Sequence, residues 1–183
     1  SCTLREAIWN ADDDAQINFD CASGSGADTI VFSFTGPSDR TITLTAALPN
    51  VTNDSVLTMD GGSLGITVSG DNQYRVFYLV NGSTLELQHI RIEKGYGTGG
   101  GGAIMGLGTL SLADSVLVRN ASSNGGAIYV GPYGSATILR STLSDNSADT
   151  YGGGIFNTGS LSVLESTLVD NNWVANNLQG LVD

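Results

Sequence analysis

The sequence predicts an all-β fold, namely a right-handed, single-stranded parallel β-helix of about six coils with a short N-terminal capping helix. Three observations lead to this prediction. A 13-residue segment occurs three times at an almost constant interval. Within each copy, apolar and polar residues alternate, and a glycine cluster precedes each copy. Such a repeat is typical of a solenoid, in which each unit buries its apolar face against its neighbours.

The first glycines of the three clearest copies are separated by 26 and then 25 residues, and a weaker fourth copy precedes them. The copies span Gly108–Asn120, Gly134–Asn146 and Gly159–Asn171, and the weaker one spans Gly82–Gly95. Each glycine cluster leads into an apolar residue, at Gly101–Ile104, Gly125–Ile128 and Gly152–Ile155. A period of about 20 to 50 residues indicates stacked supersecondary units.

The alternation within a copy has the period of a β-strand rather than that of a helix. Leu110, Leu112 and Leu117 are expected on one face, and Ser111 and Val116 on the other. Two short strands separated by a bend, followed by a glycine- or asparagine-rich corner, would form one coil. Less regular strands are expected earlier in the chain, at Thr29–Phe34, Thr41–Leu44, Ser55–Met59, Gly65–Ser69 and Val76–Val80.

The N-terminal region differs from the repeats. Residues 3–10 carry apolar residues at helical spacing, and Thr3 with Glu6 forms a capping-box pattern. A short helix here would cover the apolar end of the first coil. At the other end, Trp173–Leu181 departs from the repeat. We therefore expect an N-terminal cap over residues 1–26, β-helix coils over residues 27–172, and a C-terminal cap or truncated end over residues 173–183.

The two cysteines, Cys2 and Cys21, both precede the repeats. A disulfide between them would stabilise the fold by roughly 3 kcal/mol in the loop-entropy model. It would also indicate an oxidising compartment, whereas two buried free thiols are the alternative. A zinc site is not expected, because two Cys and the single His89 fall short of four tetrahedral ligands.

Composition excludes several classes of protein. The net charge is −11, with 7 Lys+Arg against 18 Asp+Glu, so a nucleic-acid partner is not expected. The chain has no run of about 18 apolar residues, and so no membrane span is predicted in it. Because the sequence starts at Ser1 rather than Met, we expect a removed leader or an excised piece of a larger protein.

Two segments near the N-terminus resemble a known family. CTLREAI (Cys2–Ile8), followed by GADTIVF (Gly26–Phe32), is similar to the N-terminal motif of bacterial CSLREA-type β-helix surface proteins, with Thr3 in place of the usual Ser. The glycine clusters also resemble the GGAI repeats of chlamydial polymorphic outer-membrane adhesins. Their FxxN motif is not met, because Leu143 and Leu168 stand where Phe would be. The resemblance implies a secreted or surface-anchored protein. Most proteins of this family have no assigned catalytic activity.

Alignment of the copies places charged residues in two outward rows. Such a row could bind a polymer. Alternatively, its charged residues could form ion pairs between neighbouring coils, such as Arg119–Asp145 or Arg140–Glu165, that keep the strands in register. The candidate strip consists of His89, Asp114, Arg140 and Glu165. The second row consists of Lys94, Arg119, Asp145 and Asp170.

Asn120, Asn146 and Asn171 occupy the same corner of successive copies. Asn tolerates left-handed backbone conformations, and its amide can bind the residue in the next coil. We therefore expect a structural asparagine ladder, with a ligand site as the alternative.

Residues 12–14 are consecutive aspartates that lack the spacing of a calcium loop, and no metal site or cofactor is assigned.

No catalytic residue is assigned. The mid-chain carboxylates form no recognisable motif; they are Asp54, Asp60, Asp71, Glu86 and Glu93. The expected function is that of a non-catalytic secreted or cell-surface module, a scaffold, adhesin or filament-forming unit. One alternative is a carbohydrate-active enzyme, either a polysaccharide lyase or a glycoside hydrolase. Another is a glycan-binding module. Expected partners are a second copy, through the solenoid ends, and a surface glycan or other cell-surface ligand.

Overall fold

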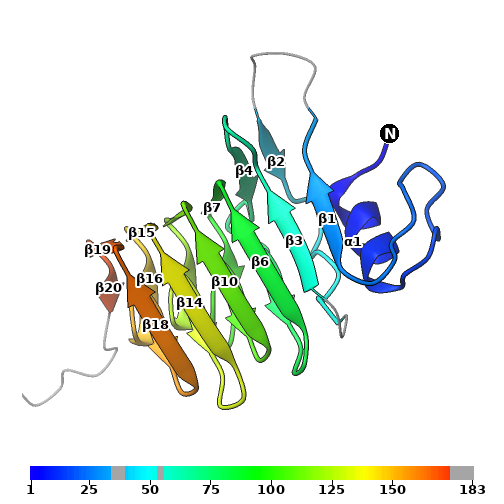
Figure 1. The fold of residues 1–183 in the computed structure, drawn as a ribbon. Helices are drawn as coiled ribbons and strands as arrows, with labels where there is room; N and C mark the ends of the chain where they lie inside the picture. Colours follow the sequence, from blue (N-terminus) through cyan, green and yellow to red (C-terminus); the bar gives the residue numbers. More distant parts are fainter. Residues whose placement is uncertain (34–39, 53–55, 174–183) are drawn as a thin grey trace, which may run out of the picture.

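The computed structural model describes residues 1–33, 40–52 and 56–173. The chain forms a parallel β-solenoid of about five turns with one helix at its N-terminal end (Figure 1). The predicted fold class is confirmed. Two of the four sheets contain six strands each, so six passes of the chain enclose about five complete turns.

We name the sheets A to D. Sheet A consists of β1 (Asp28–Val31), β3 (Val56–Asp60), β6 (Thr84–Gln88), β10 (Thr109–Ala113), β14 (Ser135–Leu139) and β18 (Ser160–Leu164). Sheet B consists of β2 (Thr41–Thr43), β4 (Ile66–Ser69), β7 (Ile90–Glu93), β11 (Val116–Val118), β15 (Thr142–Ser144) and β19 (Thr167–Val169).

The two smaller sheets complete the later coils. Sheet C consists of β5 (Phe77–Leu79), β9 (Ile104–Gly106), β13 (Ile128–Val130) and β17 (Ile155–Asn157). Sheet D consists of β8 (Tyr96–Gly97), β12 (Ala121–Asn124), β16 (Ser147–Tyr151) and β20 (Asn172–Trp173). A complete coil therefore contains four strands rather than the two expected from the sequence, because the residues around the glycine clusters also pair with the next coil.

The alternation predicted from the repeat defines the core. Leu110, Leu112 and Leu117 are at most 1% exposed, whereas Ser111 and Val116 on the opposite face are only partly buried. Equivalent residues of successive coils stand in register, so that Leu112 pairs with Leu87 on one side and Ile138 on the other. The core is thus a continuous column of aliphatic side chains along the solenoid, which no single coil could bury alone.

The bends between sheets A and B, and between sheets B and D, share one backbone feature. At each of these bends from β6 onward, one non-glycine residue has a φ between 45° and 55°, in the left-handed region. These eight residues are the two charged rows found in the sequence, namely His89, Lys94, Asp114, Arg119, Arg140, Asp145, Glu165 and Asp170. A left-handed residue turns the chain sharply, and its side chain stays outside the core.

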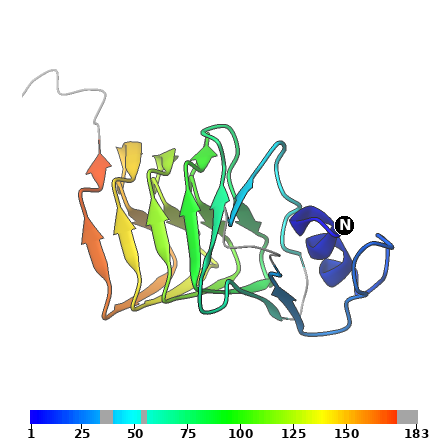
Figure 2. The same ribbon diagram turned by 90° about the horizontal axis from the view of Figure 1, so that it is seen from above.

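Helix α1 (Leu4–Asp12) covers the N-terminal end of the solenoid (Figure 2). Thr3 is its N-cap, and the predicted capping box with Glu6 is present. Leu4, Ile8 and Ala11 are buried and belong to the same apolar cluster as the first coils. The helix extends two residues beyond the predicted end at Asn10, and the buried side chain of Asn10 binds the backbone of the following loop.

The predicted disulfide joins Cys2 to Cys21, with a Cα–Cα distance of 4.8 Å. It links the residue before helix α1 to the loop that leads into β1. Cys21 is 5% exposed, so the bond is partly enclosed by the cap.

The described part of the chain ends in a strand at the start of the segment expected to depart from the repeat. Trp173 belongs to β20 and pairs with Ala148 of β16, as the next coil requires. The rest of the segment expected to form a C-terminal cap, residues 174–183, lies outside the described residues. In this last described coil, the core-facing Val163 and Leu168 are 38% and 46% exposed.

Candidate functional site

The four residues of the candidate strip all lie at the bend between sheets A and B. They do not form one connected cluster. Asp114 and Arg140 pair with each other, whereas His89 Nδ1 donates to Asp60 of the preceding coil at 2.8 Å. Glu165 adds only a longer-range attraction to Arg140. The strip is therefore a row of bends with pairwise contacts.

The ion pairs differ from those expected. Arg140 pairs with Asp114 of the preceding coil, rather than with Glu165, through two parallel hydrogen bonds of 2.8 and 2.7 Å. A guanidinium binds a carboxylate strongly in this two-pronged geometry. The hydrogen bond from Arg140 lowers the pKa of Asp114, and the same contact raises that of Arg140.

Glu93 on β7 is the centre of the second group of charges. It accepts hydrogen bonds from Arg91 at 3.0 Å and from Arg119 at 3.1 Å. Arg119 therefore reaches back to the strand of the preceding coil instead of forward to Asp145. Burial raises the pKa of Glu93, but the hydrogen bonds from the two arginines outweigh it and the net shift is downward. Its side chain is 15% exposed.

The Glu93 cluster predicts a pH-dependent contribution to stability. Because the folded-state pKa lies below the ordinary value of 4.5, the contribution is complete above about pH 4.5 and is lost as the pH falls through the folded-state pKa. Glu93→Gln should thus lower the free energy of unfolding at pH 7, on the order of 1 kcal/mol, and have a smaller effect at pH 3.

Urea unfolding at both pH values measures this difference. Glu165→Gln is the matched control, since this exposed carboxylate forms no ion pair among the described residues. An equal effect of Glu93→Gln at pH 7 and pH 3 would show that the carboxylate charge does not contribute.

The asparagines form a ladder inside the corner between sheets B and D. Asn120 Nδ2 donates to Asn146 Oδ1 at 3.0 Å, and Asn146 Nδ2 donates to Asn171 Oδ1 at 2.8 Å. Asn120 and Asn146 are fully buried. The ladder ends at Gly95, whose N–H donates to Asn120 Oδ1. A Cβ at Gly95 would collide with the carbonyl of Gly102, so an asparagine cannot occupy this corner.

A second ladder was not predicted. Ser115, Ser141 and Ser166 follow the bends between sheets A and B, and each hydroxyl accepts a backbone N–H from the preceding coil. Each hydroxyl also donates to the carbonyl two residues before it. The signal was present in the sequence, because all three copies have serine at the same repeat position.

The bend between β3 and β4 departs from the repeat. The later coils pass from sheet A to sheet B through one or two residues, whereas β3 and β4 are joined by the five-residue loop Gly61–Gly65. The loop is anchored by Asp60, whose Oδ1 accepts from Gly62 N–H and from His89, each at 2.8 Å. These two hydrogen bonds lower the pKa of Asp60, that from His89 more than that from Gly62. Leu64 at its tip is 73% exposed.

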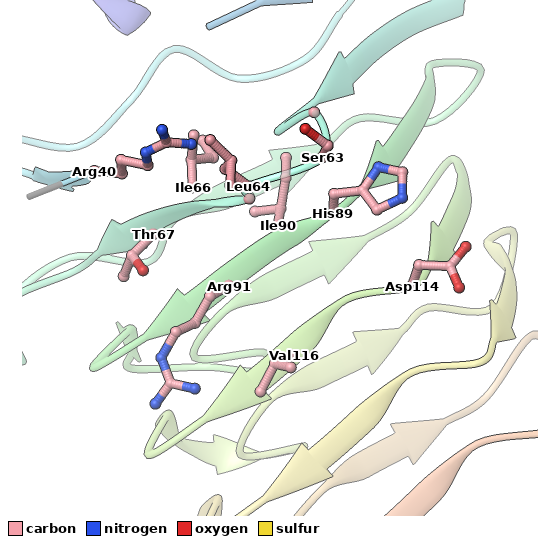
Figure 3. A pocket seen from close by; sticks show the side chains of 12 residues that line it. Arg40, Ser63, Leu64, Ile66, Thr67, His89, Ile90, Arg91, Asp114 and Val116 are labelled. Carbon is pink, nitrogen blue, oxygen red and sulfur yellow. The ribbon is translucent and has the colours of Figure 1, made fainter. Parts of the chain in front are cut away.

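A groove of about 430 Å³ lies beside this loop on sheet B (Figure 3). The loop forms one wall, and residues of β4, β7 and β11 form the floor. Figure 3 shows Arg40 and Arg91 toward one end of the groove and His89 and Asp114 toward the other. The groove thus includes two residues of the candidate strip, but its arginines were not predicted as site residues. Insertions into a repeat commonly form binding surfaces, and Gly61–Gly65 carried that signal.

A row of outward side chains on sheet C was also not predicted. The row consists of Tyr78, Met105, Tyr129 and Phe156, which stand in register. The ring centroids of Tyr129 and Phe156 are 5.4 Å apart, and Tyr151 stacks on Phe156 at 5.8 Å. The tilted contact between Tyr129 and Phe156 joins two successive coils, whereas Tyr151 and Phe156 lie on either side of the glycine corner within one coil.

The remaining acidic residues are dispersed. Asp12 accepts from Thr52, and Asp14 accepts from Gly26 N–H at 2.7 Å, so the aspartate run ties the cap to neighbouring loops. Within residues 1–33, 40–52 and 56–173, no three His, Cys, Asp or Glu side chains are grouped to hold a metal ion. Asp54 lies outside the described residues.

Comparison of the chain with protein-family models, with curated proteins and with solved structures finds no match. In the part of the chain that the structure describes, no helix has the length and apolar character needed to span a membrane.

Proposed function

We propose that this chain is a non-catalytic β-solenoid module of a secreted or cell-surface protein, in which it acts as a rigid scaffold for adhesion or assembly. The observation that carries this proposal is the use of polar side chains as contacts between successive coils. Two ion pairs, the hydrogen bond between His89 and Asp60, the asparagine ladder and the serine ladder all join residues about one coil apart. Side chains held in this way stiffen the rod and keep its strands in register.

The disulfide supports export of the chain. Disulfides persist in oxidising compartments and are rare in the reducing cytosol. The bond between Cys2 and Cys21 lies in the cap, where it protects the end of the core rather than any candidate site. This position fits a module that has to remain folded outside the cell.

Self-association is part of the proposal. The core-facing Val163, Leu168 and Trp173 are 38%, 46% and 53% exposed, and apolar side chains at a solenoid end favour contact with a further coil. A second copy can supply that contact through its own last coil. Because helix α1 covers the other end, association by this route joins two copies in a closed pair.

Sedimentation velocity over a concentration series tests this assembly. We expect a dimer that Leu168→Glu converts to monomer, because a charge would then face the buried contact. Val169→Glu is the matched control, since this neighbouring residue occupies the outward register position of β19 and is 41% exposed. A monomer at all concentrations, or equal effects of both substitutions, would remove self-association from the proposal.

Incubation with a panel of polysaccharides tests the non-catalytic function. We expect no release of sugar, and we expect the protein to attach to cells or to immobilised glycans without modifying them. Sugar release that disappears when one carboxylate of the chain is replaced by its amide would contradict the scaffold function. It would favour the carbohydrate-active enzyme instead.

A further inference from the structure

We propose that Asn81 is a site of spontaneous deamidation, in which the backbone nitrogen of Gly82 displaces the side-chain amide and leaves aspartate or isoaspartate at this position. Water is the co-reactant. This inference goes beyond the scaffold function, which involves no covalent change in the chain. It rests on the sequence at Asn81, on the exposure of its turn, and on the contrast with a second Asn–Gly pair that the fold holds in place.

An asparagine followed by glycine carries the two groups that the reaction needs. The backbone nitrogen of the glycine closes a five-membered ring when it bonds to the side-chain carbon Cγ of the asparagine. Glycine has no Cβ to hinder this approach or the rotation of the peptide. The sequence contains the pair twice, at Asn81–Gly82 and at Asn124–Gly125. The structure places the two pairs in different surroundings.

Asn81 and Gly82 are the central residues of the turn between β5 and β6, and both are exposed. The ends of the turn are held, because the N–H and the hydroxyl of Ser83 donate to Val80 O at 3.2 and 2.7 Å. Within the residues that the structure describes, neither the side-chain amide of Asn81 nor the N–H of Gly82 forms a hydrogen bond. Both reacting groups are therefore open to water, and no hydrogen bond restrains the peptide between them.

The second pair is fixed between coils. Asn124 is the last residue of β12, and its Nδ2 donates to Gly99 O at 3.1 Å. Gly125 is buried, and its N–H donates to Tyr151 O of the next coil at 2.8 Å. The nitrogen that would attack is thus already engaged, so reaction at Asn124 requires that this contact first opens.

The reaction at Asn81 has two steps. Gly82 N loses its proton to base in the solvent and bonds to Cγ, the bond between Cγ and Nδ2 breaks, and Nδ2 leaves as ammonia. Water then opens the resulting succinimide ring at one of its two carbonyl carbons. Opening at Cγ gives aspartate, whereas opening at the main-chain carbonyl carbon gives isoaspartate, in which the backbone passes through Cβ and Cγ. No group is oxidised or reduced.

The modification changes the surface charge of the solenoid without reaching its core. Either product adds one negative charge to the net charge of −11. Isoaspartate also lengthens the backbone of the turn, but β6, which follows the turn, is paired along its whole length with β3 and β10. We therefore expect the strands to stay in register, while the charge at this corner changes slowly with the age of the protein.

Incubation of the purified chain at 37 °C in water enriched in oxygen-18, at pH 8 and at pH 6, tests the proposal. After transfer to ordinary water, brief tryptic digestion isolates Asn81 in the peptide Val76–Arg91, which contains no other asparagine. Mass spectrometry should show a heavy oxygen at Asn81, gained faster at pH 8 because attack needs a deprotonated nitrogen. In the folded chain, Asn124 should react at least about tenfold more slowly, since its hydrogen bonds have to open first.

Two controls separate the effect of the fold from that of the sequence. In guanidinium chloride, where both pairs are exposed, Asn81 and Asn124 should react at similar rates. In the variant Asn81→Gln, the peptide Val76–Arg91 should stay unlabelled, because attack on the longer side chain would have to close a six-membered ring. Equal rates at the two asparagines in the folded chain would overturn the proposal. So would the absence of heavy oxygen at Asn81 over a period in which the unfolded chain incorporates it there.

Discussion

Asn146→Ala is expected to lower the free energy of unfolding by about 3 kcal/mol, because it breaks the asparagine ladder at its centre. Asn146 is fully buried. Its Nδ2 donates to Leu117 O at 3.0 Å and to Asn171 Oδ1, and its Oδ1 accepts from the backbone and side chain of Asn120. Alanine would leave donors and acceptors of three coils buried without partners.

Urea unfolding followed by circular dichroism measures this loss. Asp145→Ala is the matched control, since Asp145 precedes Asn146 and is exposed at the bend. Asp145 has a φ of 54°, so alanine at this position adds a left-handed backbone cost of about 1 kcal/mol, and the total effect of the control should stay near that value. A loss for Asn146→Ala no larger than that for Asp145→Ala would show that the ladder adds nothing to stability.

Removal of the disulfide is expected to cost about 3 kcal/mol, since in the unfolded chain the bond closes a loop between cysteines with a sequence separation of 19. The bond also holds the start of helix α1 to the loop that follows it. Without it, the helix should separate more readily from the first coil, and Leu4 and Ile8 would become accessible to solvent.

The double substitution Cys2→Ser and Cys21→Ser should therefore lower the melting temperature and increase binding of a hydrophobic dye. Treatment of the unsubstituted chain with a reducing agent should have the same effect, and it should leave the double variant unchanged. If the melting temperature of the unsubstituted chain does not respond to reductant, the cap is held by packing alone.

The fold could be predicted because the patterns that specify it lie within short segments of the sequence and recur in each copy of the repeat. Alternation in Leu110–Leu117 specifies strands with one buried face, and the constant spacing of the copies aligns each strand with its neighbour. The same alignment placed Asn120, Asn146 and Asn171 in one corner, where the structure joins them by hydrogen bonds. Strands as short as β8 carry too few residues for an alternating pattern, and so the four-strand coil was not predicted.

The candidate site was less predictable. The sequence places Arg140 next to both Asp114 and Glu165, one coil away on either side, and only side-chain geometry decides between them. Likewise, the groove depends on the path of the Gly61–Gly65 loop relative to β7, which no repeat specifies. Arg91 lies in a weak copy of the repeat, where its pairing with Glu93 two residues away has no counterpart in the other copies.

The eight left-handed bends have a consequence for the divergence of related sequences. At these positions the backbone conformation is fixed, but the side chain is outside the core, and His, Lys, Arg, Asp and Glu all occur. Exchanges among these residues, or with Asn or Gly, should therefore alter the surface charge of a single coil while the strands stay in register. Related sequences can thus differ in surface charge without any change in architecture.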